Sequence, residues 1–141
     1  MNKASAGKHY QAINAQTGVV DADPHRLIQM LFVGALDQIS VAKGCMQRSD
    51  LAGKGAAIIK AVDIVGGLRD SVNPDAGDAA LTENLAALYE FASRRLTEAN
   101  LNNDEAALDE AANVLRQLQA GWDDIRSEAL SQFKSGETQP A

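Results

Sequence analysis

The chain is 141 residues long with a net charge of −6, and 45% of its residues are hydrophobic while only 4% are aromatic. This length suits one domain that buries a core without disulfides or metal ions. The acidic balance argues against nucleic-acid binding and against attachment to an anionic membrane surface, since both need clustered Lys and Arg. No apolar run reaches the ~18 residues of a membrane span, and residues 1–14 lack the apolar core of a secretory signal. We therefore expect a cytoplasmic protein without membrane insertion.

Residues 1–22 are small and polar and show no sustained hydrophobic period. Such a segment is typical of a flexible arm, with at most a short helical turn. Tyr10 and Ile13 are apolar residues that a fully solvated arm does not need, so we expect the arm to contact the body of the protein.

The segment from Asp23 to Met46 has the pattern of one long helix. Asp23 can cap the free N–H groups of the first turn, and Pro24 suits the first helical position. The apolar residues that follow cover more than the single stripe of a surface helix; they are Leu27, Ile28, Met30, Leu31, Phe32, Val33, Ala35, Leu36 and Ile39. Either this helix lies at the centre of a bundle, or part of its surface is kept for another molecule.

A second helix is predicted from Ala56, after a glycine-containing boundary at residues 51–55. Its apolar residues are spaced three and four apart: Ile58, Ala61, Val62, Val65, Leu68 and Val72. Gly66 and Gly67 lie inside this helix, where they are either weak points or places where another helix can approach closely.

The turn residues from Asn73 to Gly77 separate the second helix from the third. The third helix has an inner face of Leu81, Leu85, Leu88, Ala92, Leu96 and Ala99, widened by Tyr89 and Phe91. Asn102 followed by Glu105 resembles a capping box for the fourth helix. The stripe of the fourth helix is the most regular in the chain: Leu108, Ala111, Leu115, Leu118, Trp122 and Ile125.

These four helices and their short connections predict an antiparallel up-and-down four-helix bundle over residues 23–130. Residues 131–141 are interpreted as a disordered tail and residues 1–22 as the flexible arm.

Reactive side chains are too few and too scattered to indicate an enzyme, a metal site or a cofactor. The single cysteine, Cys45, lies among residues expected to be covered and is interpreted as a packing residue. His25 carries the alternative function, a histidine phosphotransfer domain on a four-helix bundle. Those domains resemble one another around His-x-x-Lys-Gly, whereas Arg26-Leu27-Ile28-Gln29 follow the histidine here.

The surplus of apolar surface indicates a binding module instead. Large exposed apolar patches usually mark a partner site, often a groove that accepts an amphipathic helix. The sequence leaves open whether part of this surface forms a homodimer.

Several runs of the sequence resemble the FliS family of flagellar secretion chaperones: HYQAINAQ, DADPHRLIQMLFVGAL, IIKAVDIVGGLRDSV, ENLAALYEFASRRLTEANLNND and LRQLQAGW. The resemblance covers about Tyr10 to Ile125. It implies a helical bundle that binds the disordered C-terminal segment of flagellin in apolar grooves, prevents premature polymerisation and assists delivery to the flagellar type III export apparatus. It also implies that the arm carrying Tyr10 takes part in docking to an export gate component.

The resemblance and the apolar pattern together predict a set of partner-binding residues: Tyr10, Ile13, Ile28, Leu31, Phe32, Ile58, Val62, Val65, Leu85, Leu88, Tyr89, Phe91 and Arg95. Several of the apolar helix residues in this set must instead fill the core, and the sequence does not say which. Within the first long helix, we assign Leu27, Met30 and Ile39 to the core and Ile28, Leu31 and Phe32 to a groove. The chain departs from the family where Phe32-Val33 precedes Gly-Ala-Leu, since a tyrosine and an aspartate are usual there. Pro74 in the central turn is a second departure.

Overall fold

The computed structural model describes residues 23–72 and 78–137, and from residue 125 onward it describes the backbone alone. These ranges hold four helices and no strand: α2 (Pro24–Gln47), α3 (Leu51–Asp70), α4 (Ala79–Asn102) and α5 (Glu105–Glu137). The all-α prediction is confirmed. The predicted arm with Tyr10 and Ile13, and the predicted turn at residues 73–77, lie outside the described residues.

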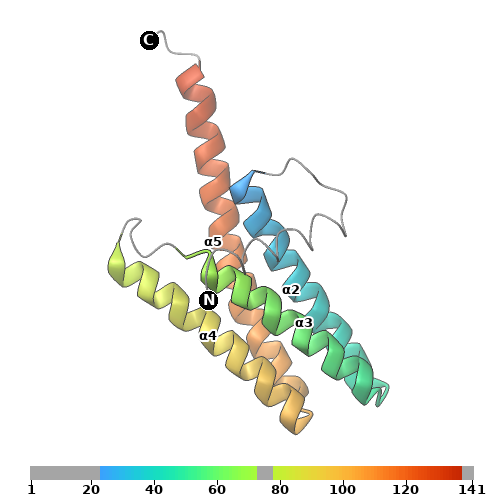
Figure 1. The fold of residues 1–141 in the computed structure, drawn as a ribbon. Helices are drawn as coiled ribbons and strands as arrows, with labels where there is room; N and C mark the ends of the chain where they lie inside the picture. The colour runs from blue at the N-terminus through green and yellow to red at the C-terminus, as the bar shows by residue number, and fades with distance from the viewer. Residues whose placement is uncertain (1–22, 73–77, 138–141) are drawn as a thin grey trace.

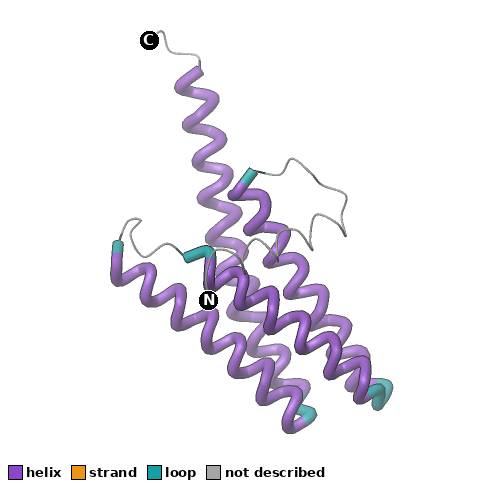
Figure 2. Tube along the Cα trace, in the orientation of Figure 1, coloured by secondary structure: helices purple, strands orange, loops and turns teal. Residues whose placement is uncertain are grey.

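The helices form a bundle in which each one packs against two others (Figure 1). α2 contacts α3 and α5, and α4 also contacts α3 and α5. Figure 2 shows that a short loop joins α2 to α3, that another joins α4 to α5, and that the chain reverses direction at each. The predicted up-and-down antiparallel topology is therefore confirmed.

The start of α2 agrees with its sequence signals. The Asp23 carboxylate accepts a hydrogen bond of 2.7 Å from the backbone N–H of Arg26, and Pro24 occupies the first helical position. The carboxylate gives a partner to one backbone N–H group of the first turn, and Pro24 has no N–H group that needs one.

The start of α3 was predicted at Ala56, but the helix begins at Leu51. The reason is a local cap, because the Asp50 carboxylate accepts a hydrogen bond of 2.9 Å from the N–H of Gly53. A Cβ at Gly53 would lie 2.3 Å from an Asp50 carboxylate oxygen and 2.8 Å from the Cys45 sulfur. The glycine is thus required by the close approach of the two helix ends, and the buried Cys45 is a packing residue as predicted.

The turn between α4 and α5 differs in detail from the predicted capping box. Asn103 adopts the left-handed conformation with φ 52° and ψ 46° and ends α4, a role for which asparagine is suited. The cap of α5 is Asp104, whose carboxylate accepts hydrogen bonds from the N–H groups of Ala106 and Ala107. The Asn102–Glu105 pair is therefore not the cap.

The far end of α5 also departs from the sequence-based boundary at residue 130. The helix continues to Glu137 and extends past the start of α2 (Figure 1). Residues 128–134 contain Glu, Ala, Leu, Gln and Lys, which are good helix formers, and no proline. A helix can therefore continue where we expected a disordered tail.

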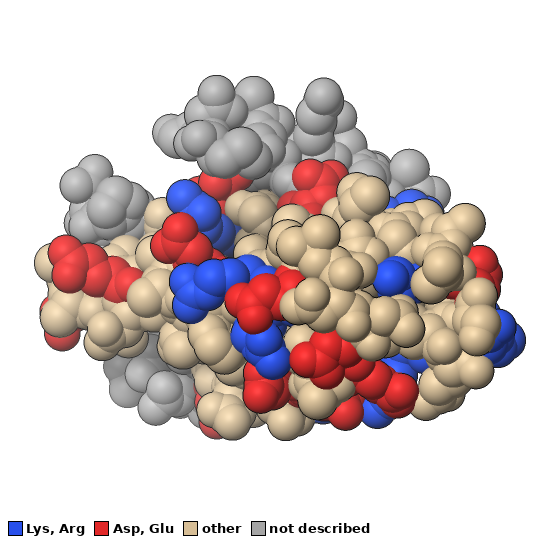
Figure 3. Space-filling view, turned by 90° about the horizontal axis from the view of Figure 1, so that it is seen from below, with Lys and Arg blue, Asp and Glu red and all other residues tan. Residues whose placement is uncertain are grey.

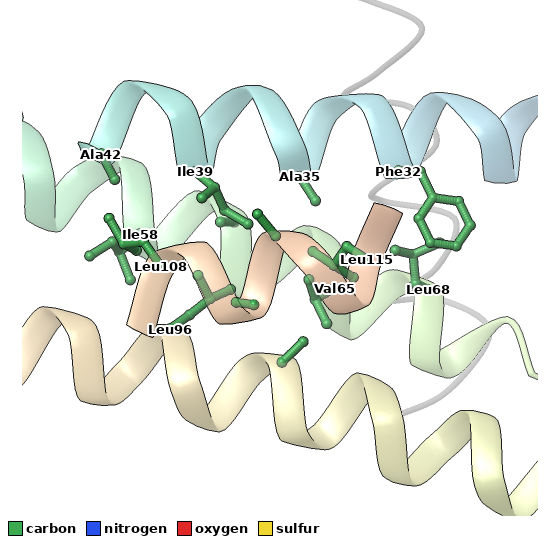
Figure 4. Packing of buried hydrophobic residues seen from close by; sticks show 14 of the residues in the cluster. Phe32, Ala35, Ile39, Ala42, Ile58, Val65, Leu68, Leu96, Leu108 and Leu115 are labelled. Carbon is green, nitrogen blue, oxygen red and sulfur yellow. The ribbon is translucent and has the colours of Figure 1, made fainter. Parts of the chain in front are cut away.

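The core is mostly aliphatic and lies on the axis of the bundle. Figure 4 shows side chains from all four helices pointing toward one another: Phe32, Ala35, Ile39, Ala42, Ile58, Val65, Leu68, Leu96, Leu108 and Leu115. Most of them are fully buried. Each large aliphatic side chain buried in this way contributes about 1.5–3 kcal/mol, so these residues account for much of the driving force for folding.

Candidate partner-binding site

Most of the predicted groove residues on α2 and α3 lie in the core. The buried members of the predicted set are Ile28, Leu31, Phe32, Ile58, Val65 and Tyr89. Leu31 and Phe32 are 0% and 1% exposed, so their assignment to a surface groove is corrected. The physical reason is that α2 packs against both α3 and α5 and buries two faces at once.

Tyr89 is the aromatic residue that joins α4 to this core. Its ring lies 6.3 Å from the ring of Phe32, measured between centroids. Burial raises the pKa of the Tyr89 hydroxyl to about 12, because the phenolate would be poorly solvated there. Tyr89 therefore acts as a neutral packing residue at physiological pH.

The remaining predicted residues lie nearer the surface. Val62, Leu85 and Phe91 are half-buried and Leu88 is 41% exposed. Leu88 shares the N-terminal part of α4 with Leu81, which is 57% exposed. This part of α4 thus presents apolar side chains outward.

Arg95, another of the predicted partner-binding residues, makes its contacts within the bundle. Its guanidinium group donates hydrogen bonds to the carboxylates of Glu110 on α5 and Glu98 on α4. Both contacts raise the pKa of Arg95 above its ordinary value, and the hydrogen bond to Glu110 contributes the most. Arg95 thus forms an ion-pair clamp between α4 and α5.

A groove lies between α3 and α4 and has a volume of about 530 Å³. Its lining residues come from one face of each helix: Ile58, Ile59, Val62, Asp63, Gly66, Arg69, Ser93, Thr97 and Asn100. Ile58 is only 2% exposed and forms the floor, whereas Ile59 is 65% exposed. Of the predicted site residues, this groove brings together Ile58 and Val62.

Ile59 and Gly66 are groove residues that the sequence reasoning did not assign to the site. With Val62 they fall at positions i, i+3 and i+7, which is one face of a helix. This face lies beside the core face of α3 that contains Ile58 and Val65. The second stripe is thus visible in the sequence once the core stripe has been set aside.

Charges of both signs are intermingled on the face of the bundle seen in Figure 3. The Lys43 ammonium lies 2.8 Å from the Asp109 carboxylate and 3.9 Å from that of Glu105. The hydrogen bond to Asp109 is the main cause of a raised Lys43 pKa. No large field of one sign appears on this face, so the apolar groove is the more distinctive surface feature.

His25, the residue of the phosphotransfer alternative, is packed against α5. Its ring stacks on that of Trp122 with 4.1 Å between centroids, and the indole N–H donates a 2.9 Å hydrogen bond to the His25 carbonyl oxygen. Both ring nitrogens are buried and have no hydrogen-bond partner in the described part of the chain. A phosphoacceptor needs an accessible ring nitrogen, so this packing speaks against phosphotransfer.

Metal-binding groups and membrane-spanning helices are both absent from the described residues. Among residues 23–72 and 78–124, whose side chains are described, no three or more His, Cys, Asp or Glu side chains form a group that could hold a metal ion. In the same ranges, none of the helices combines the length and apolarity needed to cross a bilayer.

The fold defines the class as all-α helical-bundle proteins, here with a mainly apolar groove between α3 and α4. Comparison with known proteins gives the family. The family model described as flagellar protein FliS matches residues 6–129. This chain belongs to the FliS family.

The curated relatives cover nearly the whole chain. The flagellar secretion chaperone FliSB of Pseudomonas aeruginosa is 42% identical over 125 residues, which is 89% of this chain and 98% of the relative. The flagellar secretion chaperone FliS of Salmonella typhimurium is 35% identical over 133 residues, 94% of this chain and 98% of the relative. The flagellar secretion chaperone FliS of Escherichia coli is 37% identical over 123 residues, which is 86% of this chain and 90% of the relative. The resemblance inferred from the sequence motifs is thereby confirmed.

Proposed function

We propose that this protein is a cytoplasmic flagellar export chaperone without catalytic activity. It binds the disordered C-terminal segment of flagellin, prevents premature polymerisation and assists delivery of flagellin to the type III export apparatus. Membership of the FliS family supports this role, and the observation that carries the binding step is the apolar groove between α3 and α4.

The groove suits a flagellin segment that becomes helical on binding. Ile58 provides an apolar floor, and Val62 with the exposed Ile59 offers side chains that a ligand can cover. Each aliphatic side chain that becomes buried contributes about 1.5–3 kcal/mol. Several such contacts offset the free energy needed to order a disordered ligand, which is about 2–5 kcal/mol.

The apolar residues on the outside of α4 form a second contact surface in our proposal. Leu81 and Leu88 are 57% and 41% exposed, and Leu85 is half-buried between them in the sequence. With about 3.6 residues per turn, Leu81 and Leu88 lie on a different side of α4 from Ser93 and Thr97 of the groove, so a long ligand would reach them as a separate contact. The predicted contacts of Leu85 and Leu88 with flagellin thus remain part of the proposal.

The arm belongs to a separate step, docking to the export gate. We propose that Tyr10 and Ile13, which lie outside the described residues, contribute to this contact, as the family resemblance implies. A homodimer, if it forms, would use the same exposed apolar surface, and flagellin would then compete with the second copy.

Titration calorimetry tests the binding step with a synthetic peptide that spans the C-terminal segment of flagellin from the same genome. We expect saturable binding together with a gain of helical circular dichroism. Ile59→Asp should weaken binding at least tenfold, because it removes an apolar contact and places a charge in the interface. Val41→Asp is the matched control, since Val41 is 50% exposed on α2 and does not line the groove. Absence of binding by the unmodified protein would refute the proposed function.

A further inference from the structure

Gly66 occupies a position in α3 that packing among the described residues does not explain. It is half-buried, lines the groove and lies well inside the helix. Beyond its own helical turns, a Cβ built on Gly66 meets no atom of the described residues within 4 Å. Glycine inside a helix is less stable than alanine by about 0.5–1 kcal/mol. The bundle therefore tolerates a destabilising residue where alanine would fit.

Gly53, in the same helix, differs from Gly66 because other side chains crowd it. A Cβ at Gly53 would collide with Asp50 and Cys45 of the same chain, so that glycine serves the fold. At Gly66 the free space opens into the groove instead. A bare backbone at this position lets the backbone of another helix approach closely, because interaxial distances depend on the side chains at the contact.

The opposite wall of the groove also has small side chains. Ser93 and Thr97 on α4 line it, and the Thr97 hydroxyl donates a 3.0 Å hydrogen bond to the Ser93 carbonyl oxygen within α4. The hydroxyl is thus already satisfied and does not require a partner from a ligand. Both walls therefore permit a closely packed ligand near Gly66.

Two charged residues lie on either side of Gly66 along the groove. Asp63 and Arg69 are exposed, and with a rise of 1.5 Å per residue they lie about 9 Å apart along α3. Neither side chain makes an ion pair with any residue in the described ranges. They are available to a ligand that presents a basic group near Asp63 and an acidic group near Arg69. This order of charges favours one of the two directions in which a bound helix could run along the groove.

We infer that the flagellin segment lies in this groove as an amphipathic helix with a small residue (Gly, Ala or Ser) over Gly66, a basic residue facing Asp63 and an acidic residue facing Arg69. This inference rests on the proposed function. Gly66 is then a specificity-determining residue, because it sets how closely the ligand helix can approach. The charges set which way the ligand helix runs.

Substitutions at Gly66 test this inference because they should move stability and affinity in opposite directions. Gly66→Ala should raise the melting temperature of the free protein, while the Kd for the flagellin peptide rises a few-fold. Gly66→Leu should raise that Kd at least tenfold through steric overlap with the ligand. The control is Gly121→Ala, because Gly121 is exposed on α5 and a Cβ added there also meets nothing within 4 Å. It should raise the melting temperature and leave the Kd unchanged.

Charge exchange tests the direction of the ligand. Asp63→Lys should weaken binding, and a peptide whose facing basic residue is changed to glutamate should recover affinity for that variant. Recovery is a readout that general damage to the fold cannot produce.

The outcomes separate the inference from the proposed function. If the unmodified protein does not bind the peptide, the proposed function fails and the inference fails with it. If the unmodified protein and Gly66→Leu bind equally well, the inference is overturned while the proposed function stands. If Gly66→Leu changes only the oligomeric state in sedimentation experiments, the groove holds a second copy of the chain, which also overturns the inference.

Discussion

Replacing Lys54 should destabilise the bundle, because this lysine joins α3 to the end of α4. Its side chain is buried, with 7% of the residue exposed. The ammonium group donates hydrogen bonds of 3.0 Å to the Asn100 carbonyl oxygen and 3.3 Å to the Asn103 side-chain oxygen. It thus satisfies a carbonyl in the last turn of α4, where the helix leaves acceptors without partners and a positive charge is favoured.

The expected change in the free energy of unfolding for Lys54→Met is the balance between lost hydrogen bonds and relieved desolvation. Methionine keeps an apolar stem of similar length, so little packing is lost. Hydrogen bonds to a charged group contribute about 1.5–3 kcal/mol each, and a positive charge at a helix C-terminus contributes about 0.3–1 kcal/mol. Relief of the desolvation of a buried ammonium group offsets part of this loss. We expect a net loss of about 1–2 kcal/mol in the free energy of unfolding.

Urea denaturation followed by circular dichroism measures this loss directly. Lys60→Met is the matched control, because Lys60 lies exposed on the same helix and has no side-chain hydrogen bond or ion pair to the described residues. Its free energy of unfolding should change by less than about 0.5 kcal/mol. An unchanged or increased stability of Lys54→Met would refute the argument, since it would mean that desolvation outweighs both hydrogen bonds.

Three other predictions concern the core and the helix ends. Phe32→Ala should lower the free energy of unfolding by about 3–5 kcal/mol, because Phe32 is 1% exposed and truncation leaves a cavity; a calorimetric melt that is nearly unchanged would place Phe32 outside the core. The Tyr89 pKa of about 12 lies above the ordinary value of 10.0, so its contribution to the free energy of unfolding is fully present below pH 10 and is lost between pH 10 and 12, by up to about 3 kcal/mol. Tyr89→Phe should remove that part of the alkaline loss of stability, and an identical pH profile for the variant would contradict the assignment. Gly53→Ala should cost about 1–3 kcal/mol through overlap with Asp50 and Cys45, and thermal denaturation against Gly121→Ala distinguishes this overlap from the general effect of adding a methyl group to a helix.

The four helices and their antiparallel order could be predicted because the apolar periods and most breaks are local signals. The cap at Asp23 and the stripe around Leu108 and Leu115 are examples that the structure confirms. The start of α3 could not be placed, because Asp50 caps a segment whose glycines resemble a loop in the sequence. One of those glycines, Gly53, is present for a contact between helix ends that no local pattern specifies.

The division between core and groove could be predicted only in part. Phe32 and Ile59 are both large apolar residues on apolar helices, yet the first is 1% exposed and the second 65%. The difference depends on which neighbour covers each face, and that follows from packing among all four helices. The ion pair of Arg95 could not be predicted either, because its partner Glu110 lies on another helix.

The arrangement of small and large residues supports an external role for the face between α3 and α4. Alanines such as Ala35, Ala42 and Ala111 are fully buried, so close packing is achieved inside the bundle with small side chains. On the outside of α3, the large Ile59 is exposed and a glycine, Gly66, lies inside the helix, and stability favours neither arrangement. The two residues are seven apart and therefore share one helix face. Because both departures from a stable surface occur in the same groove, binding of a partner would explain them together, whereas packing among the described residues explains neither.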